Sequence, residues 1–317
     1  ATGIPARNIL IAATHSHTGP LYFGALRHHF HEKPIEEKGS DRAELVDYPM
    51  QLTGRLIRAI QQGQRKLQPV ELSAGYAREE RLAFNRRFHM KNGTVQFNPG
   101  QLNPNIVRAA GPVDPEVAIV KLTRPGAAKP AAAIVSFALH LDTLGGTEFS
   151  ADYPRFVQET LRESQGEEFV SLFGTGTCGD INHVDVTVKG RRPTSEIGTM
   201  LGETVAAQID HLDAVARPSL AVRSAVIEAD LQTFSSDEIA QARRNMELIG
   251  DPKLPFLDQV LAYKVVSIDK RGGRPIELEV QAFRLGNDCA VVTLPGEIFV
   301  ELGMAIKQAS PRGVTRR

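Results

Sequence analysis

The sequence lacks several features that would point to a class of protein at once. It has no Trp, only two Cys, and no excess of either charge, because 37 Lys and Arg residues balance 37 Asp and Glu residues. A neutral chain gives no electrostatic support for binding to nucleic acid or for a polybasic grip on a membrane. Two cysteines are too few for a disulfide-dense scaffold, and one disulfide or two thiols are equally allowed.

The sequence also has no apolar run near the ~20 residues that a membrane-spanning helix needs. The longest run, residues 130–141, contains Ser136 and His140, and we interpret it as a buried strand. The first residues have neither an initiator Met nor a signal-peptide pattern, which is typical of a mature or excerpted chain. Hydrophobic residues make up 42% and charged residues 23%, as in soluble globular proteins.

Strand-like and helix-like patterns alternate along the chain. Ser235 and Glu238 form a capping box, which predicts a helix that Gly250 ends. The fold class predicted is α/β, with mixed β-sheets flanked by helices and a metal site at the C-terminal ends of strands. We expect strands at 8–14, 70–76, 117–122, 131–140, 169–173, 276–282 and 289–294, and helices at 49–66, from 154, at 195–209, 235–249 and 298–308.

Two histidines follow the first predicted strand with one residue between them. Alternation in a strand directs His15 and His17 to the same side, with backbones about 6.6 Å apart. His140 ends a second predicted strand, and Glu297 follows a third. Two imidazoles and a carboxylate make a sufficient catalytic zinc set. Taken singly, each residue has an ordinary explanation: a polar strand end, a satisfied core histidine, or an acid at a helix N-terminus.

Other polar segments are less specific. Residues 174–180 are glycine-rich but lack the Gly-Lys-Ser/Thr ending of a phosphate-binding loop, which we therefore reject. Asp180, at the end of this segment, is typical of a turn. Arg86 offers a guanidinium for a carboxylate or an oxyanion. The histidines at 28, 29 and 31 lie in a polar stretch that predicts a solvated loop.

The motifs together resemble those of the neutral (non-lysosomal) ceramidases, zinc amidases that cleave ceramide. Residues 13–20, ATHSHTGP, resemble that family's THTHSGP signature. Further similarities follow in the same order: NR at 85–86, FALH at 137–140, SADYP at 150–154, GD at 179–180 and PGE at 295–297. The similarity extends over nearly the whole chain, so we expect a single ceramidase-like catalytic domain over residues 1–317.

The resemblance implies a specific site. Zn²⁺ would be held by His15, His140 and Glu297, and the catalytic residues would be His17, Arg86 and Asp180. It also implies a small-molecule or lipid substrate, peripheral contact with a lipid surface, and a secreted or periplasmic location. No nucleic-acid partner is expected, and the oligomeric state stays open.

The sequence departs from the family pattern in three respects. Asn182 stands where the family's GDVSPN segment has its Ser, and His183 stands where it has Pro. The family's fourth zinc ligand is a Tyr downstream of the PGE motif, and this sequence has no Tyr after Tyr263. The family's C-terminal immunoglobulin-like domain is also missing. We expect a short relative or an excerpt, with a wetter metal site that favours small or loosely held substrates.

Three functions compete on the sequence alone. The first is a zinc-dependent amidase acting on ceramide or a related N-acyl lipid, with a metal-dependent esterase as its variant. The second is a degenerate relative that binds without catalysis. The third, an amidohydrolase barrel, also uses His-x-His but requires further metal-binding residues that the stretch from 220 to 294 does not supply.

Overall fold

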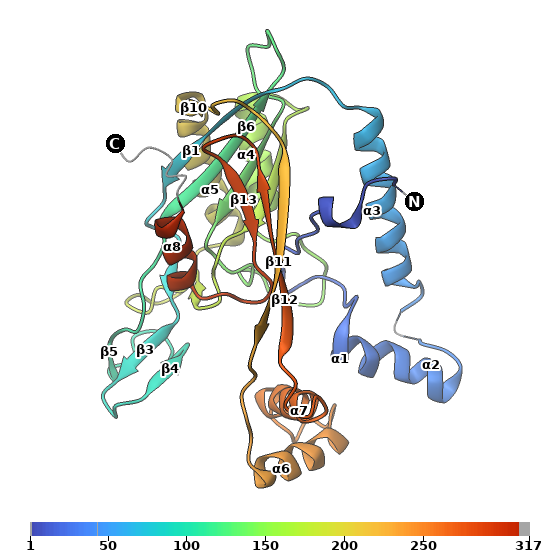
Figure 1. Ribbon diagram of the computed structural model, residues 1–317. Helices are drawn as coiled ribbons and strands as arrows, with labels where there is room; N and C mark the ends of the chain where they lie inside the picture. The colour runs from blue at the N-terminus through green and yellow to red at the C-terminus, as the bar shows by residue number, and fades with distance from the viewer. Residues whose placement is uncertain (1, 43, 311–317) are drawn as a thin grey trace. The chain divides into compact units, whose positions relative to one another are not determined.

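The structure is a computed structural model that describes residues 2–42 and 44–310 (Figure 1). It divides into two compact units. Unit 1 comprises residues up to 20, residues 54–223 and the chain from 281 onward, and unit 2 comprises residues 21–53 and 224–280. Three of the four division points fall within α3 (Tyr48–Arg65), β11 (Ala221–Ala229) and β12 (Ile276–Arg284). A single catalytic domain over residues 1–317 stays a prediction.

Unit 1 is built on a five-stranded sheet. Its order is β10 (Asp213–Ala214), β1 (Glu71–Arg78), β6 (Glu116–Thr123), β7 (Ala132–Phe137) and β8 (Val170–Thr175). All neighbours are antiparallel except β7 and β8. A parallel pair needs a crossover connection, which contains α4 (Pro154–Gln165). The carboxyl ends of β7 and β8 therefore meet at one edge, and the segments after them become neighbours.

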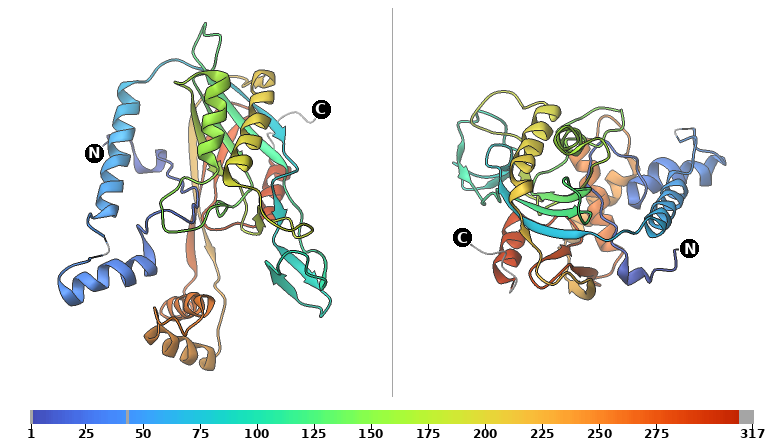
Figure 2. Two further views of the ribbon diagram at one scale, coloured as in Figure 1. Left: turned by 180° about the vertical axis from the view of Figure 1, so that it is seen from behind. Right: turned by 90° about the horizontal axis from the view of Figure 1, so that it is seen from above.

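The sheet has an apolar layer on each face, as the alternation of its side chains requires. Helices α4 and α5 (Thr194–Gln208) lie side by side over one face (Figure 2). That face carries Val117 and Val135, which belong to the main core. The other face carries Ala74 and Val120, which pack with Cys289 beside the hairpin of β12 and β13 (Ala290–Thr293). Both cysteines of the chain are buried free thiols, which decides the alternative left open by the sequence.

Short elements surround the end of the sheet where β7 and β8 stop. Strand β2 (Phe84–Asn85) pairs with β9 (Ile181–Asn182), and this pairing holds the segment around residue 85 against the segment that follows β8. Strands β3 (Arg87–Met90), β4 (Val95–Phe97) and β5 (Ile106–Ala109) form a separate small sheet. The remaining elements of unit 1 are η1 (Ala6–Asn8), η3 (Ile209–His211) and α8 (Val300–Ala309).

Unit 2 is mainly helical within its described residues. Helices α6 (Ser236–Glu247) and α7 (Phe256–Asp269) pack through Ala242, Ala262 and Val265. The predicted capping box at the start of α6 is confirmed, because the Ser235 hydroxyl accepts from the Glu238 N–H and the Glu238 carboxylate accepts from the Ser235 N–H. A second helical segment runs through α1 (Gly24–Arg27), the π-helical η2 (His28–Glu32) and α2 (Lys33–Lys38).

The mixed α/β class is confirmed, but two local predictions are wrong. Residues 9–16 form no strand, since Ile11 is 67% exposed and His15 has a left-handed φ of 65°. An apolar run indicates a strand only if a partner strand is available, and here none pairs with it among the described residues. The polar stretch with the three histidines is helical rather than a loop. Among the described helices, none combines the length and apolar character required to span a membrane.

Candidate functional site

Three histidines of unit 1 bring their Nε2 atoms together. The Nε2 atom of His15 lies 3.0 Å from that of His140 and 3.2 Å from that of His17. The three rings meet edge to face, with centroids 4.6–5.2 Å apart. Three imidazole nitrogens directed at one point are a donor set suited to Zn²⁺ and to other borderline-soft metals.

The segment carrying His15 and His17 reaches this place without being a strand. The Thr14 carbonyl accepts a hydrogen bond from the Thr175 hydroxyl at the end of β8. The His17 N–H donates to the Leu141 carbonyl, beyond the end of β7. The left-handed backbone of His15 then turns its ring toward that of His17. The predicted convergence of the two rings is therefore present, although its cause is a turn and not strand alternation.

His140 is held in one orientation by its backbone surroundings. The side chain is buried, and its Nδ1–H donates to the Cys178 carbonyl at 3.0 Å. Because a carbonyl only accepts, this bond leaves the unprotonated Nε2 of a neutral ring facing His15. Burial also lowers the pKa of both His140 and His15. The two rings are thus neutral near pH 7, which is the form that binds metals.

Glu297 and Arg86 complete the cluster. Glu297 follows β13 through Pro295 and Gly296, whose φ of 93° permits the turn. One carboxylate oxygen lies 3.6 Å from His15 Nε2, and the other lies 3.8 Å from His140 Nε2 and 3.5 Å from an amino group of Arg86. The guanidinium of Arg86 is fixed by two hydrogen bonds to the Gly179 carbonyl, at 2.6 and 3.2 Å.

Asp180 lies next to the cluster, but its carboxylate is fully buried and engaged elsewhere. One oxygen accepts from Asn85 Nδ2 at 3.1 Å and from the guanidinium of Arg87 at 2.7 and 3.1 Å. The other oxygen accepts from the Val300 N–H at the start of α8, at 2.9 Å. Asp180 thus connects β2, β3 and α8 and holds the segment that carries Glu297.

Two residues near the site received no role from the sequence: Asp142, and His183, which was noted only as a departure from the family pattern. Asp142 accepts from His183 at 3.1 Å, and the Nε2 atom of His183 is buried without a hydrogen-bond partner among the described residues. Burial would raise the pKa of Asp142, but the hydrogen bond from His183 lowers it below its ordinary value. The sequence signal for Asp142 was its position, since it is a second polar residue only two positions after His140. Asn182, at the position of the family Ser, donates to Asn98 and accepts from the Val184 N–H.

A second group of potential ligands lies in unit 2. The Nδ1 atom of His31 is 2.7 Å from Asp41 and 4.0 Å from Glu44. Glu44 also forms a two-point ion pair with the buried Arg27, whose hydrogen bond lowers the pKa of the Glu44 carboxyl. We interpret this group as a charge network that stabilises α1, because a metal would have to displace Arg27 from Glu44.

The fold and the site define the class of protein: a mixed α/β protein with a histidine cluster beside a carboxylate and a guanidinium. No protein-family model and no curated protein matches the chain. Among solved structures, it is similar to the neutral ceramidase from Pseudomonas aeruginosa, with a TM-score of 0.60, 19% sequence identity, and coverage of 94% of this chain and 50% of that chain. It is also similar to a ceramidase complexed with C2, with a TM-score of 0.62, 17% identity, and coverage of 94% and 51%.

These comparisons confirm the resemblance at the level of the fold. The chain spans about half the length of the ceramidases that it matches. At this identity the likeness establishes a shared fold alone. The metal, the reaction and the substrate have to be argued from this chain's own residues.

Proposed function

We propose that the protein is a zinc-dependent hydrolase that cleaves the amide bond of ceramide or a related N-acyl lipid. The observation that carries the proposal is the convergence of His15, His17 and His140 on one point beside Glu297, in a chain with a ceramidase fold. His15, His140 and Glu297 are the ligands that we assign to Zn²⁺. His17 is assigned to the substrate side, although its Nε2 lies as near to His15 as a fellow ligand would.

The residues fit a zinc ion by their chemistry. The hydrogen bond from His140 to the Cys178 carbonyl is an orienting contact of the kind that metal-binding histidines usually make through their second nitrogen. The neutral rings need not lose a proton before binding, and the Glu297 carboxylate offsets part of the ion's charge. Zinc bound here would lower the pKa of a water molecule and polarise the carbonyl of the scissile bond.

The chain's own residues provide positioning and proton transfer. The Gly179 carbonyl holds the guanidinium of Arg86, and one of its amino groups lies 3.5 Å from Glu297. We therefore assign Arg86 to the binding of an oxyanion beside the cluster. His17 is the one histidine of the three that is exposed to solvent, so it suits proton transfer to the leaving amine. Asp180 acts through its partners: it fixes Arg87 and the start of α8, and so places Glu297.

One observation favours a second candidate. Asn182 replaces the Ser of the resembled family, and both ends of its amide are already hydrogen-bonded. An amide side chain neither attacks a carbonyl nor titrates, so a serine-dependent step is absent. This favours an esterase, whose substrate has a better leaving group, or a binding protein without catalysis. The extracytoplasmic location and the contact with a lipid surface stay predictions that rest on the resemblance.

The test combines metal analysis with hydrolysis. We expect the purified chain to contain zinc and to hydrolyse N-acyl or ester substrates of graded chain length, with loss on chelation and recovery on zinc addition. His15→Ala, His140→Ala and Glu297→Ala should lose the metal. The matched controls His211→Ala and Glu167→Ala change exposed residues and should keep both metal and activity.

Two further variants separate the roles. His17→Ala should keep the metal and lose about 100-fold or more in rate, as expected for a proton-transfer group. Arg86→Ala should lose about 100- to 1000-fold, as expected for an oxyanion donor. The proposal fails if zinc is absent, or if His15→Ala and Glu297→Ala leave its binding unchanged. Metal binding without turnover of either substrate class would support the binding relative instead.

A further inference from the structure

Unit 2 contains a pocket of about 480 Å³ that none of the preceding chemistry uses. Its wall is formed by η2 and the start of α2 on one side, and by α6 and α7 on the other. The volume is within the range of about 300–1,000 Å³ that is usual for small-molecule sites. The pocket is therefore large enough for an organic ligand and not only for a single ion.

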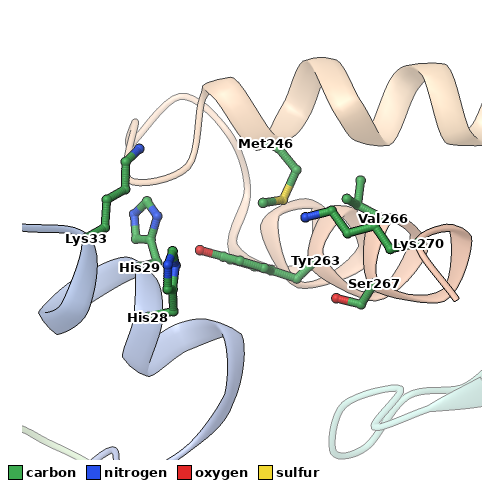
Figure 3. A pocket seen from close by; sticks show the side chains of 8 residues that line it. All are labelled: His28, His29, Lys33, Met246, Tyr263, Val266, Ser267 and Lys270. Atoms are coloured by element: carbon green, nitrogen blue, oxygen red, sulfur yellow. The ribbon is translucent and has the colours of Figure 1, made fainter. Parts of the chain in front are cut away.

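The polar lining of this pocket consists of bases and hydroxyls. The bases are Lys33, Lys270, His28 and His29, and no Asp or Glu is among the described residues that line it. Figure 3 shows the Tyr263 hydroxyl directed across the pocket toward His28 and His29, with the Lys270 ammonium on the same side as Tyr263. Several hydrogen-bond donors from separate elements thus face one space, a pattern suited to an anion with several acceptor oxygens.

Tyr263 provides a second, independent observation at this pocket. Its hydroxyl is buried and has no hydrogen-bond partner among the described residues. Buried polar groups are nearly always paired, and each exception needs an explanation. Burial raises the pKa of Tyr263, so the hydroxyl keeps its proton and is a donor. A ligand oxygen in the pocket would be the missing acceptor.

The positive charges of the pocket are only weakly compensated. Lys33 lies 3.5 Å from Glu37, and His28, which carries a charge only when protonated, lies 3.8 Å from Glu36; all four side chains are exposed. Exposed pairs of this kind contribute little and yield readily to another partner. No ion pair or side-chain hydrogen bond of Lys270 is found in the described part of the chain. The pocket therefore keeps a net attraction for anions.

We propose that this pocket binds a phosphate group carried by an organic molecule. A phosphate offers several acceptor oxygens in a tetrahedral arrangement, and its charge matches the two lysines. Met246 and Val266 provide an apolar wall for the rest of the ligand. The phosphate belongs either to a soluble phosphate compound or to a phospholipid headgroup, and the two sources share the same recognition.

The experiment measures binding directly on the full chain, at low ionic strength. One arm titrates the protein with inorganic phosphate in a calorimeter. The other arm sediments it with vesicles of phosphatidylglycerol and, for comparison, of phosphatidylcholine. We expect Lys33→Gln and Lys270→Gln to weaken binding about tenfold each, the loss expected for one charge-assisted hydrogen bond. The control Lys253→Gln removes an exposed lysine of unit 2 that does not line the pocket.

Tyr263→Phe distinguishes a ligand contact from a structural role. It should weaken phosphate binding several-fold without lowering the thermal midpoint of the unliganded protein, because the hydroxyl loses no protein partner. Binding of free phosphate, or of phosphatidylglycerol vesicles alone, with loss in the lysine variants supports the proposal and identifies the source. It is overturned if neither probe binds, or if Lys253→Gln weakens binding as much as Lys270→Gln. The measurement needs no hydrolysis, so its outcome is independent of the proposed activity.

Discussion

Replacing Asp180 by Asn tests whether this buried carboxylate acts by positioning the site. Asn is almost isosteric with Asp, but its NH₂ group must face one of two sets of donors. If it faces Asn85 and Arg87, it meets the amide and guanidinium N–H groups; otherwise it meets the Val300 N–H. In either orientation at least one hydrogen bond becomes a repulsion between donors, and Arg87 loses its buried counter-ion.

The expected magnitude follows from the surroundings of Arg87. Breaking a buried ion pair by removing one partner costs about 3–5 kcal/mol. Here the Arg87 side chain is 17% exposed, and it keeps Glu301 at 3.8 Å and the ring of Phe299 at 4.5 Å. These remaining contacts place the estimate near the lower end, so we expect the free energy of unfolding to fall by about 3 kcal/mol.

The assay is urea unfolding followed by circular dichroism, with metal content and hydrolysis measured on the folded protein. Asp210→Asn changes an exposed carboxylate and should stay within about 0.5 kcal/mol of the parent chain. Folded Asp180→Asn should hold metal more weakly, because Asp180 anchors the start of α8 and with it the segment that carries Glu297. An unchanged urea midpoint together with lost hydrolysis would refute the positioning role and place Asp180 in the chemistry.

Two further predictions concern unit 1. A Cβ at Gly179 would lie 2.8 Å from the carbonyl carbon of Glu297. Gly179→Ala should therefore displace Glu297, destabilise the chain by about 1–3 kcal/mol and reduce its metal content. In the control Gly174→Ala the new Cβ meets nothing within 4 Å, so stability and metal content should stay unchanged. Burial would raise the pKa of Glu79, but hydrogen bonds from Arg81 and a Thr hydroxyl lower it below its ordinary 4.5. The contribution of Glu79 to the free energy of unfolding is therefore present above pH 4.5 and lost as the pH falls through the lowered pKa. Glu79→Gln should make the free energy of unfolding fall less steeply with pH in the acid range, and an unchanged slope there would contradict this.

Much of the fold followed from local patterns. The alternation at residues 276–282 and the capping box at Ser235 correspond to β12 and the start of α6. The capping box is local, and β12 pairs with β13, which is the next strand along the chain. The strand predicted at residues 8–14 failed for the opposite reason. Its apolar composition was suitable, but a strand exists only where another strand offers hydrogen bonds, and that is decided by the whole fold.

The site shows the same division. Motif spacing selected His15, His17, His140, Arg86 and Glu297, and the structure brings these residues together. The pair of Asp142 and His183 belongs to none of the matched motifs, so only the structure revealed it. Asp180 has the residue type of a catalytic acid, and only the structure shows that its carboxylate is buried and accepts hydrogen bonds from Arg87 and the Val300 N–H.

The sequence by itself determined the chemistry on offer: which imidazoles, carboxylates and guanidiniums the chain possesses, and which family's motifs their order resembles. The tertiary structure alone decided where those groups point. It brought together the Nε2 atoms of residues 125 positions apart and fixed the proton of His140 on the nitrogen facing the Cys178 carbonyl. It also left a basic pocket in unit 2. The sequence sets the type of each residue, whereas the direction and burial of each side chain result from contacts between distant segments, which no local pattern encodes.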